Sequence, residues 1–164
     1  MASETFEVAI FMVTAVVAAV ILVSAVFPMV NDATETFSQT AAGADSKERT
    51  KLTLVNTYLS GSDLKVWLKN TGTGRISVAD LNKANFFGGS ETVYAIYSRV
   101  NSVSSENQWS YSILSGDLEY LNTGDTLEIT AKGAFPTLLS GDYAYMSFVL
   151  PNGVKVTGTF APNA

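Results

Sequence analysis

The stretch VAIFMVTAVVAAVILVSAVFPMV, residues 8–30, decides how this chain folds. It contains no charged residue, and about 20 apolar residues are enough to cross a lipid bilayer as a helix. Apolar side chains occupy consecutive positions, so they cover the whole circumference of a helix instead of forming one stripe. The stretch therefore predicts a helix that is surrounded by apolar groups on every side.

On the N-terminal side, Glu4 and Glu7 are the only charged residues before this run. Carboxylates in the first turns favour the positive end of the helix dipole, and Ser3 just before them suits helix capping. The alternative is that these carboxylates pair with the N-terminal amine of a neighbouring copy in an assembly. Both readings place Glu4 and Glu7 at the start of the helix.

A cleavable signal peptide is the main alternative for the apolar run. The segment Val23-Ser24-Ala25 resembles a small-residue cleavage site. However, no Lys or Arg precedes the run, and the run is long for a signal peptide. We therefore expect the helix to be retained in the mature protein.

On the C-terminal side, Ala33, Phe37 and Ala41 recur at helical spacing and extend the predicted helix. Gly43 is a typical stop signal, so we predict a helical segment at residues 1–43 and an exposed linker at residues 44–50. Pro28 removes one backbone donor, which predicts a bend or break near residues 24–28.

The predicted helix has two candidate environments. It lies in lipid as an anchor, or it packs against copies of itself in the core of a filament. Small residues allow close helix approach in either environment, and here they are Ala15, Ala18, Ala19 and Ala25. The sequence alone leaves both environments open.

From residue 51 to residue 164 the pattern changes to the alternation that is typical of half-buried strands. Leu64, Val66 and Leu68 face one way, and the residues between them face the other. Further strands are expected at residues 52–59, 92–100, 108–114, 125–131, 142–150 and 154–160. Asn152-Gly153 between the last two predicts a hairpin with a type I′ turn. The fold class is therefore α+β and mainly β: a long hydrophobic helix followed by an antiparallel, immunoglobulin-like β-sandwich.

Composition excludes several classes of function. The chain has 164 residues, a formal net charge of -5, no Cys and no His. The acidic balance argues against nucleic acid as a partner. Without His or Cys, the chain has no thiol nucleophile, no disulfide, no common zinc ligand and no usual general base. We expect a protein that is not an enzyme and that has no cofactor, catalytic residue or small-molecule substrate.

The remaining chemical motifs have ordinary structural explanations. Ser–Lys pairs occur at Ser62 with Lys65 and at Ser46 with Lys47, but neither has the supporting motif of a hydrolase. Carboxylates alternate at Asp117 with Glu119 and at Asp125 with Glu128, which turn caps and solvated sheet faces explain. Gly-Asp turns at Asp117, Asp125 and Asp142 leave a calcium site as a minor alternative.

Two aromatic pairs are candidates for a recognition patch. They are Trp109 with Tyr111, and Phe86 with Phe87. We favour core packing for both, because aromatic side chains usually fill the interior of a sandwich.

Several blocks of the sequence together resemble proteins of the archaellum, the archaeal motility apparatus. MASET at residues 1–5 precedes the apolar helix, and VWLKNTGTGRI at residues 66–76 resembles the FlaG-type accessory protein. NFFG, WSYSI, GDTLEI and LPNGV follow in the same order, beginning at residues 85, 109, 124 and 150. The related archaellins share the plan of a helix followed by a sandwich and a type IV pilin-like N-terminus.

This resemblance implies a structural subunit of the archaeal motility filament, with packed helices inside and sandwiches outside. The implied partners are further copies of the chain, a cell-envelope protein, and the membrane before assembly. The implied location is the extracellular filament. Alternatives are a membrane-anchored FlaG-type protein that links the motor to the envelope, or an unrelated anchored binding domain. The expected assembly residues are Glu4, Glu7, Ala15, Ala18, Ala19, Phe27 and Pro28.

Overall fold

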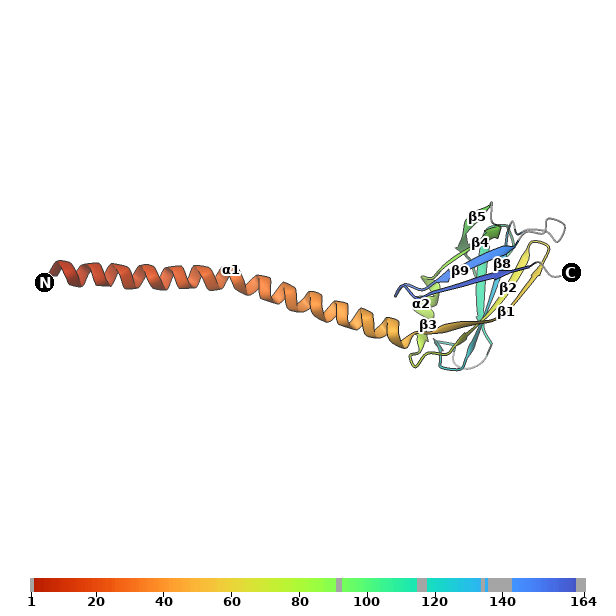
Figure 1. Ribbon diagram of the computed structural model, residues 1–164, viewed down its shortest axis with the longest axis horizontal. Helices are drawn as coiled ribbons and strands as arrows, with labels where there is room; N and C mark the ends of the chain where they lie inside the picture. Colours follow the sequence, from red (N-terminus) through yellow and green to blue (C-terminus); the bar gives the residue numbers. More distant parts are fainter. Residues whose placement is uncertain (1, 91–92, 115–117, 134, 136–142, 162–164) are drawn as a thin grey trace. The chain divides into compact units, whose positions relative to one another are not determined.

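The structure is a computed structural model that describes residues 2–90, 93–114, 118–133, 135 and 143–161. The chain divides into two compact units, Met1–Ala44 and Asp45–Ala164. The first unit contains most of helix α1 (Ala2–Arg49), and the second contains the last turn of α1 and every strand (Figure 1). We call the second unit the β-domain.

Helix α1 continues through Pro28 without interruption. Proline cannot donate a hydrogen bond to the carbonyl of Ser24, but one missing bond is not enough to end a long helix. The ribbon bends gently after this level (Figure 1). The break that the sequence allowed at residues 24–28 is therefore absent.

The prediction that the helix ends at Gly43 is wrong. Helix α1 extends to Arg49, so residues 44–49 of the expected linker are helical. Two local effects favour this extension. The Arg49 guanidinium bonds to the Asp45 carboxylate four residues earlier, with an Nε–Oδ1 distance of 3.0 Å. In addition, Lys47 and Arg49 place positive charge at the negative end of the helix dipole.

The β-domain contains ten strands and a short helix among its described residues. The strands are β1 (Leu52–Ser60), β2 (Asp63–Asn70), β3 (Ile76–Ser77), β4 (Asn85–Ser90), β5 (Tyr94–Arg99), β6 (Gln108–Ile113), β7 (Tyr120–Leu121), β8 (Thr126–Lys132), β9 (Ala144–Val149) and β10 (Lys155–Phe160). Helix α2 (Val78–Asn82) is capped by Ser77, whose hydroxyl accepts a hydrogen bond from the Asp80 amide.

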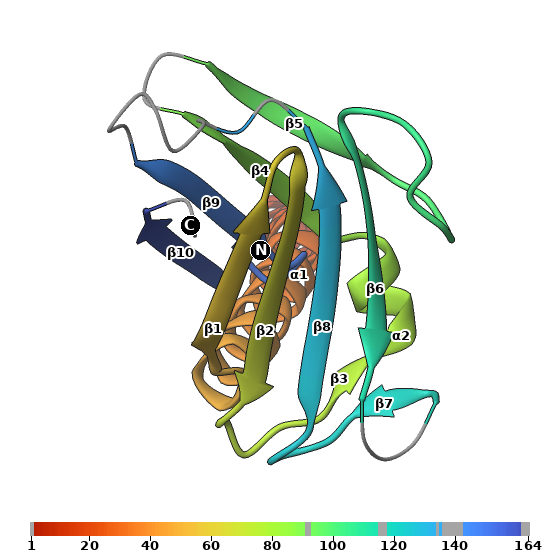
Figure 2. The ribbon, with the colours of Figure 1, turned by 90° about the vertical axis from the view of Figure 1, so that its right-hand side faces the viewer.

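The strands form two layers, in the order β1-β2-β8-β6 and β5-β4-β9-β10 (Figure 2). The layers join where β5 pairs with β6 over Ser98–Gln108 and Arg99–Trp109. This pairing is parallel, which the expectation of a fully antiparallel sandwich did not include. The remaining strand pairs are antiparallel among the residues that the structure describes. The sandwich-like fold and the mainly β class are confirmed.

The core lies between the two layers. Leu64, Val66 and Leu68, predicted from their alternation to share one face, are fully buried there. Trp109 is fully buried in the centre, with its ring centroid 5.7 Å from that of Phe148 and 6.1 Å from that of Phe86. Aromatic rings from both layers therefore provide much of the apolar surface that stabilises the β-domain.

The hairpin between β9 and β10 is confirmed, but its turn type differs from the prediction. Only Gly153 has a positive φ, at 81°, whereas a type I′ turn requires positive φ at Asn152 as well. The Gly153 amide donates to the Leu150 carbonyl, and the Leu150 amide donates to Val154. The connection is a three-residue loop with glycine at its left-handed position, and Pro151 suits the turn that precedes this glycine.

Candidate assembly site

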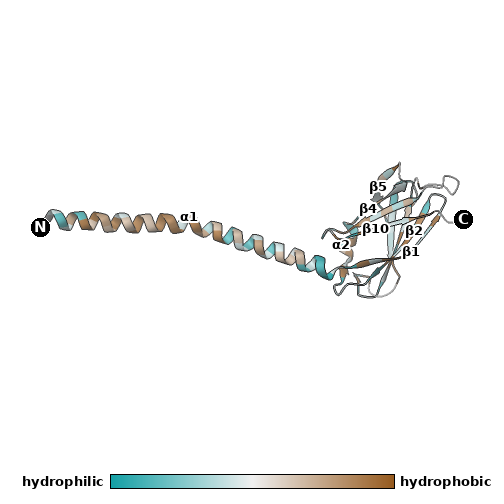
Figure 3. Ribbon diagram, in the orientation of Figure 1, coloured by the Kyte–Doolittle hydropathy of each residue, from teal (hydrophilic) through white to brown (hydrophobic). Residues whose placement is uncertain are grey.

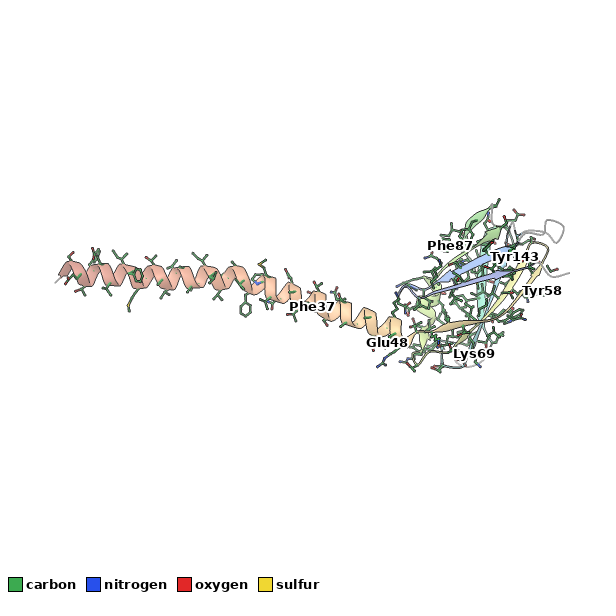
Figure 4. The ribbon with its side chains drawn as sticks, viewed as in Figure 1. Phe37, Glu48, Tyr58, Lys69, Phe87 and Tyr143 are labelled. Atoms are coloured by element: carbon green, nitrogen blue, oxygen red, sulfur yellow. The ribbon has the colours of Figure 1, made fainter. Side chains whose placement is uncertain are left out.

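The first candidate surface is helix α1 itself. Every side chain from residue 3 to residue 49 is exposed, and apolar residues dominate the first half of the helix (Figure 3). Phe37, labelled in Figure 4, projects from the helix and is 77% exposed. A soluble protein rarely leaves such a large apolar surface in contact with water, so this surface requires lipid or other protein.

One hydroxyl group of the apolar run is satisfied within the helix. Thr14 is the first hydroxyl residue within this run, and its Oγ1 donates to the Ile10 carbonyl at 2.8 Å. This arrangement removes the need for water around the hydroxyl. Helix α1 is long and apolar enough to cross a membrane by length and composition, although a signal sequence passes the same test.

The expected assembly residues all lie on α1, but they do not share one face. At 3.6 residues per turn, Glu4, Glu7, Ala15, Ala18 and Ala19 fall within about a third of the circumference. Phe27 and Pro28 lie outside this arc. The arc combines small side chains with the two N-terminal carboxylates, and we call these five residues the small-residue face.

The second candidate feature lies inside the β-domain, where α1 ends and β1 begins. The carbonyl of Arg49, the last helical residue, accepts a hydrogen bond from the Gly74 amide at 3.0 Å. Two residues later, the Lys51 carbonyl accepts hydrogen bonds from the amides of Thr71 and Gly72, at 2.8 and 3.1 Å. The Arg49 carbonyl at the helix end has no partner within the helix, and here the loop after β2 provides one.

The buried side chain of Asn70 organises this loop. Its Nδ2 donates to the carbonyls of Gly74 and Leu121, and its Oδ1 accepts from the Gly72 amide. Asn70 is 0% exposed, so each of these bonds compensates for lost contact with water. The sequence alone carries no signal that this loop holds the end of α1.

Asn152 in the β9–β10 hairpin contacts the same region. Its Nδ2 lies 3.0 Å from Oγ1 of Thr50 and 3.5 Å from Oγ of Ser46. A small cavity of about 80 Å³ lies beside these groups, and Arg75 and Asp80 contribute to its lining. The last turn of α1 is therefore part of the β-domain, with hydrogen bonds from two separate loops.

The catalytic and metal alternatives gain no support from the described residues. Lys65 bonds to Glu128 instead of Ser62, with an Nζ–Oε1 distance of 3.3 Å. No group of three or more metal-ligating side chains occurs within the part of the chain that the structure describes. Asp117 and Asp142, two of the three residues in the calcium alternative, lie outside that part, and Asp125 accepts from the Asn122 amide within its turn.

The aromatic pairs divide between core and surface. Phe86 and Trp109 are fully buried, as core packing requires. Tyr111 is partly buried, and its hydroxyl donates to Oδ1 of Asn82 at 2.6 Å. Phe87 lies on the outer face of the β5-β4-β9-β10 layer and stacks on Tyr94, with ring centroids 6.2 Å apart.

The sequence comparison gives one full-length relative. An uncharacterized protein of Archaeoglobus fulgidus is 26% identical over 166 residues, which cover 98% of this chain and 99% of the relative. No family model matches the chain.

Among solved structures, the chain resembles archaellum proteins. The archaellum periplasmic stator protein FlaG from Sulfolobus acidocaldarius is 25% identical, with a TM-score of 0.54 over 68% of this chain and 99% of that chain. A chain of the archaellum periplasmic stator protein complex FlaF and FlaG from the same organism gives the same identity and TM-score, over 68% of this chain and 89% of that chain. The archaeal flagellum of Methanospirillum hungatei matches 96% of this chain and 93% of that chain, with 15% identity and a TM-score of 0.64.

The structural neighbours are thus archaellum proteins of both stator and filament type, and they support a cell-surface or envelope location. The match to the flagellum shows a shared fold, because its identity is low. The match to FlaG adds sequence similarity to the shared fold. The resemblance read from the sequence blocks is confirmed at the level of an archaellum-related component with an N-terminal helix.

Proposed function

We propose that this chain is a FlaG-type accessory component of the archaellum, anchored in the membrane by α1, with the β-domain outside the membrane. The observation that supports this choice is the 25% identity to the stator protein FlaG along 99% of that chain. Identity to the flagellum is 15%. The proposed function is structural, and it requires neither a cofactor nor a substrate.

The geometry of α1 fits this role. The uncharged run at residues 8–30 is long enough for a bilayer, and its side chains are exposed around the whole circumference. The β-domain has its own aromatic core and does not depend on α1 residues 1–44 to bury it. The proposed partners are the membrane and other archaellum proteins, by analogy with the FlaF–FlaG complex.

Shearing cells to remove their filaments tests the accessory role. The chain should stay with the cell envelope after shearing, and its abundance in the filament fraction should be far below that of the main subunit. Quantitative mass spectrometry of both fractions measures this. If the chain is instead the major protein of the sheared filaments, the accessory role is wrong.

The second candidate is the main filament subunit, as the sequence analysis favoured. The specific observation for it is the match to the flagellum, which includes 96% of this chain, against 68% for FlaG. In this case α1 packs with copies of itself through the small-residue face, and Phe27 and Pro28 contact further copies. The membrane then holds the chain only before assembly.

A further inference from the structure

The tip of the β9–β10 hairpin contains the only Asn-Gly pair in the sequence, Asn152-Gly153. Asparagine is one of the residues that are lost by chemical change at raised temperature. The loss is easiest before glycine, because the nitrogen of the following residue must reach the asparagine side chain and glycine has no Cβ atom to hinder it. This pair is therefore the position at which the chain deamidates most readily.

Deamidation at this pair has two steps. First, the Gly153 backbone nitrogen forms a bond to Cγ of Asn152, loses its proton to solvent and displaces the Nδ2 group as ammonia. Water then opens the cyclic imide at either of its carbonyls, which leaves an aspartate or an isoaspartate. The net change consumes one water and releases one ammonia, so no other reagent is needed.

The folded hairpin holds both reacting groups in hydrogen bonds. The Gly153 amide, which must lose its proton, donates to the Leu150 carbonyl at 2.9 Å. Oδ1 of Asn152 accepts from the Val154 amide at 3.1 Å, and Nδ2 lies 3.0 Å from Oγ1 of Thr50. The Gly153 bond must break before the imide closes, and Nδ2 must leave Thr50 before ammonia departs. The reaction therefore requires local opening of the hairpin.

The end of α1 accommodates an amide at this position and not a carboxylate. Thr50 has one hydroxyl proton, which Oγ1 donates to the Ser46 carbonyl at 2.7 Å. Toward Asn152 this oxygen is therefore an acceptor, and Nδ2 is the donor that it needs. A carboxylate has no proton to donate, and it would lie beside the negative end of the helix dipole. Asp80, which lines the same small cavity as Asn152, adds a further negative charge.

We propose that Asn152 is a deamidation site whose rate is set by the end of α1. While Thr50 holds the side-chain amide, the hairpin stays closed and the reaction is slow. Opening of the hairpin permits the reaction, and the carboxylate that forms cannot restore the bond to Thr50. The chain then loses one of its contacts between the hairpin and the helix end. This inference does not rest on the proposed function, and its readouts are mass and unfolding instead of motility.

Peptide mapping of the full chain, aged in detergent at mildly alkaline pH, tests the first part of the proposal. Mass spectrometry scores each asparagine for the gain in mass when an amide becomes an acid. Thr50→Val removes the acceptor for Nδ2, so it should speed the reaction at Asn152 about two- to tenfold, as loss of one hydrogen bond implies. Thr40→Val is the matched control, because Thr40 also donates to a carbonyl of α1, that of Thr36 at 2.8 Å.

The same three chains in denaturant give the rate without the fold. Wild type, Thr50→Val and Thr40→Val should then react at Asn152 equally fast, and faster than folded wild type. Circular dichroism at the ageing temperature selects conditions in which all three are folded in detergent. Equal rates for folded Thr50→Val and Thr40→Val would overturn the proposal, and so would equal rates for folded and denatured wild type.

Asn152→Asp tests the second part, because it introduces the carboxylate directly. It should lower the thermal transition of the full chain in detergent more than Asn101→Asp, which adds the same charge at an exposed position. Adding Thr50→Val should shrink the effect of Asn152→Asp, since the two side chains are coupled through one contact. Equal transitions for Asn152→Asp and Asn101→Asp, or fully additive effects in the double variant, would contradict the proposal.

Discussion

Gly72 lies where the loop after β2 contacts the end of α1. A Cβ atom at this position would overlap the carbonyl oxygen of Arg49 and lie 2.6 Å from the Lys51 amide nitrogen. Both contacts are with backbone, which cannot rotate away as a side chain can. Glycine is therefore required by close approach, and not by a positive φ.

We predict that Gly72→Ala lowers the free energy of unfolding of the β-domain by about 1–3 kcal/mol, because added bulk must displace the helix end. Gly43→Ala is the matched control. Its added Cβ meets nothing within 4 Å, and alanine favours a helix. Thermal unfolding of the full chain in detergent measures both. Equal transition temperatures for Gly72→Ala and Gly43→Ala would contradict this reading of the loop.

Gly153 is required for a different reason. Its φ of 81° is unfavourable for a residue with a Cβ atom, although a Cβ there would meet nothing within 4 Å. We predict that Gly153→Val costs about 1–3 kcal/mol, more than any Asp substitution in the β-domain. Gly153→Asn should cost less, because asparagine tolerates this conformation. Denaturant titration measures the series, and an unchanged midpoint for Gly153→Val would refute the turn assignment.

Tyr97 makes the stability of the β-domain depend on pH in the alkaline range. Burial, with a smaller effect from the charge of Glu106, raises the pKa of Tyr97 to about 12 from 10.0. The unfolded chain therefore loses this proton first as the pH rises above 10. Stability from this group is fully present below pH 10 and falls between pH 10 and 12, by at most about 1.4 kcal/mol per pH unit.

Tyr97→Phe should remove this part of the pH dependence. Urea midpoints of the full chain in detergent, measured at pH 9 and pH 11.5, give the comparison. The wild-type midpoint should fall more between these two values than the midpoint of Tyr97→Phe. The same fall in both proteins would show that Tyr97 does not titrate as described.

At the scale of elements, the small-residue face of α1 separates an anchor from a filament core. A lone helix in lipid tolerates Ala15→Trp, Ala18→Trp or Ala19→Trp, because lipid tails rearrange around the added ring. In a packed core, each change overfills a contact and costs about 1–3 kcal/mol in every subunit.

For the proposed anchor, we therefore predict normal membrane retention and normal swimming in all three tryptophan variants. Membrane fractionation and electron microscopy of the filaments measure the outcome. Loss of filaments, or filaments with altered symmetry, would favour the main-subunit candidate instead.

Strands could be predicted where apolar and polar residues alternate along the sequence and burial follows that alternation. Leu127 and Ile129 are buried on β8, whereas Glu128 between them and Thr130 after them are partly exposed. The parallel β5–β6 contact could not be predicted, because it depends on the path of the loop at residues 100–107. The end of α1 was misplaced because Gly43 is a local stop signal. The hydrogen bonds from Gly74 to Arg49 and from Asn152 to Ser46 reach the last turn from elsewhere in the chain.

The candidate assembly site was predictable only in part, namely where it depends on a local run of residues. An uncharged run predicts an apolar helix without reference to any other segment, and α1 is such a helix. The roles expected for Glu4, Glu7, Phe27 and Pro28 remain predictions, because they depend on neighbouring molecules.

At the scale of the whole molecule, the two units differ in the charged residues that they carry. All ten basic residues lie in the β-domain, beginning at Lys47, while the first unit carries only the acidic residues Glu4, Glu7, Asp32 and Glu35. The uncharged run lies between the two acidic pairs of the first unit. This division fits one unit adapted to an apolar environment and another adapted to water.

The central claim, that this chain is an archaellum component, is tested most directly by the swimming of cells that lack it. The gene for the chain would be deleted in an archaellated host, and swimming would be scored by video microscopy. The account predicts that swimming is lost, that the full chain restores it, and that residues 45–164 alone do not. Normal swimming in the deletion strain would contradict the account.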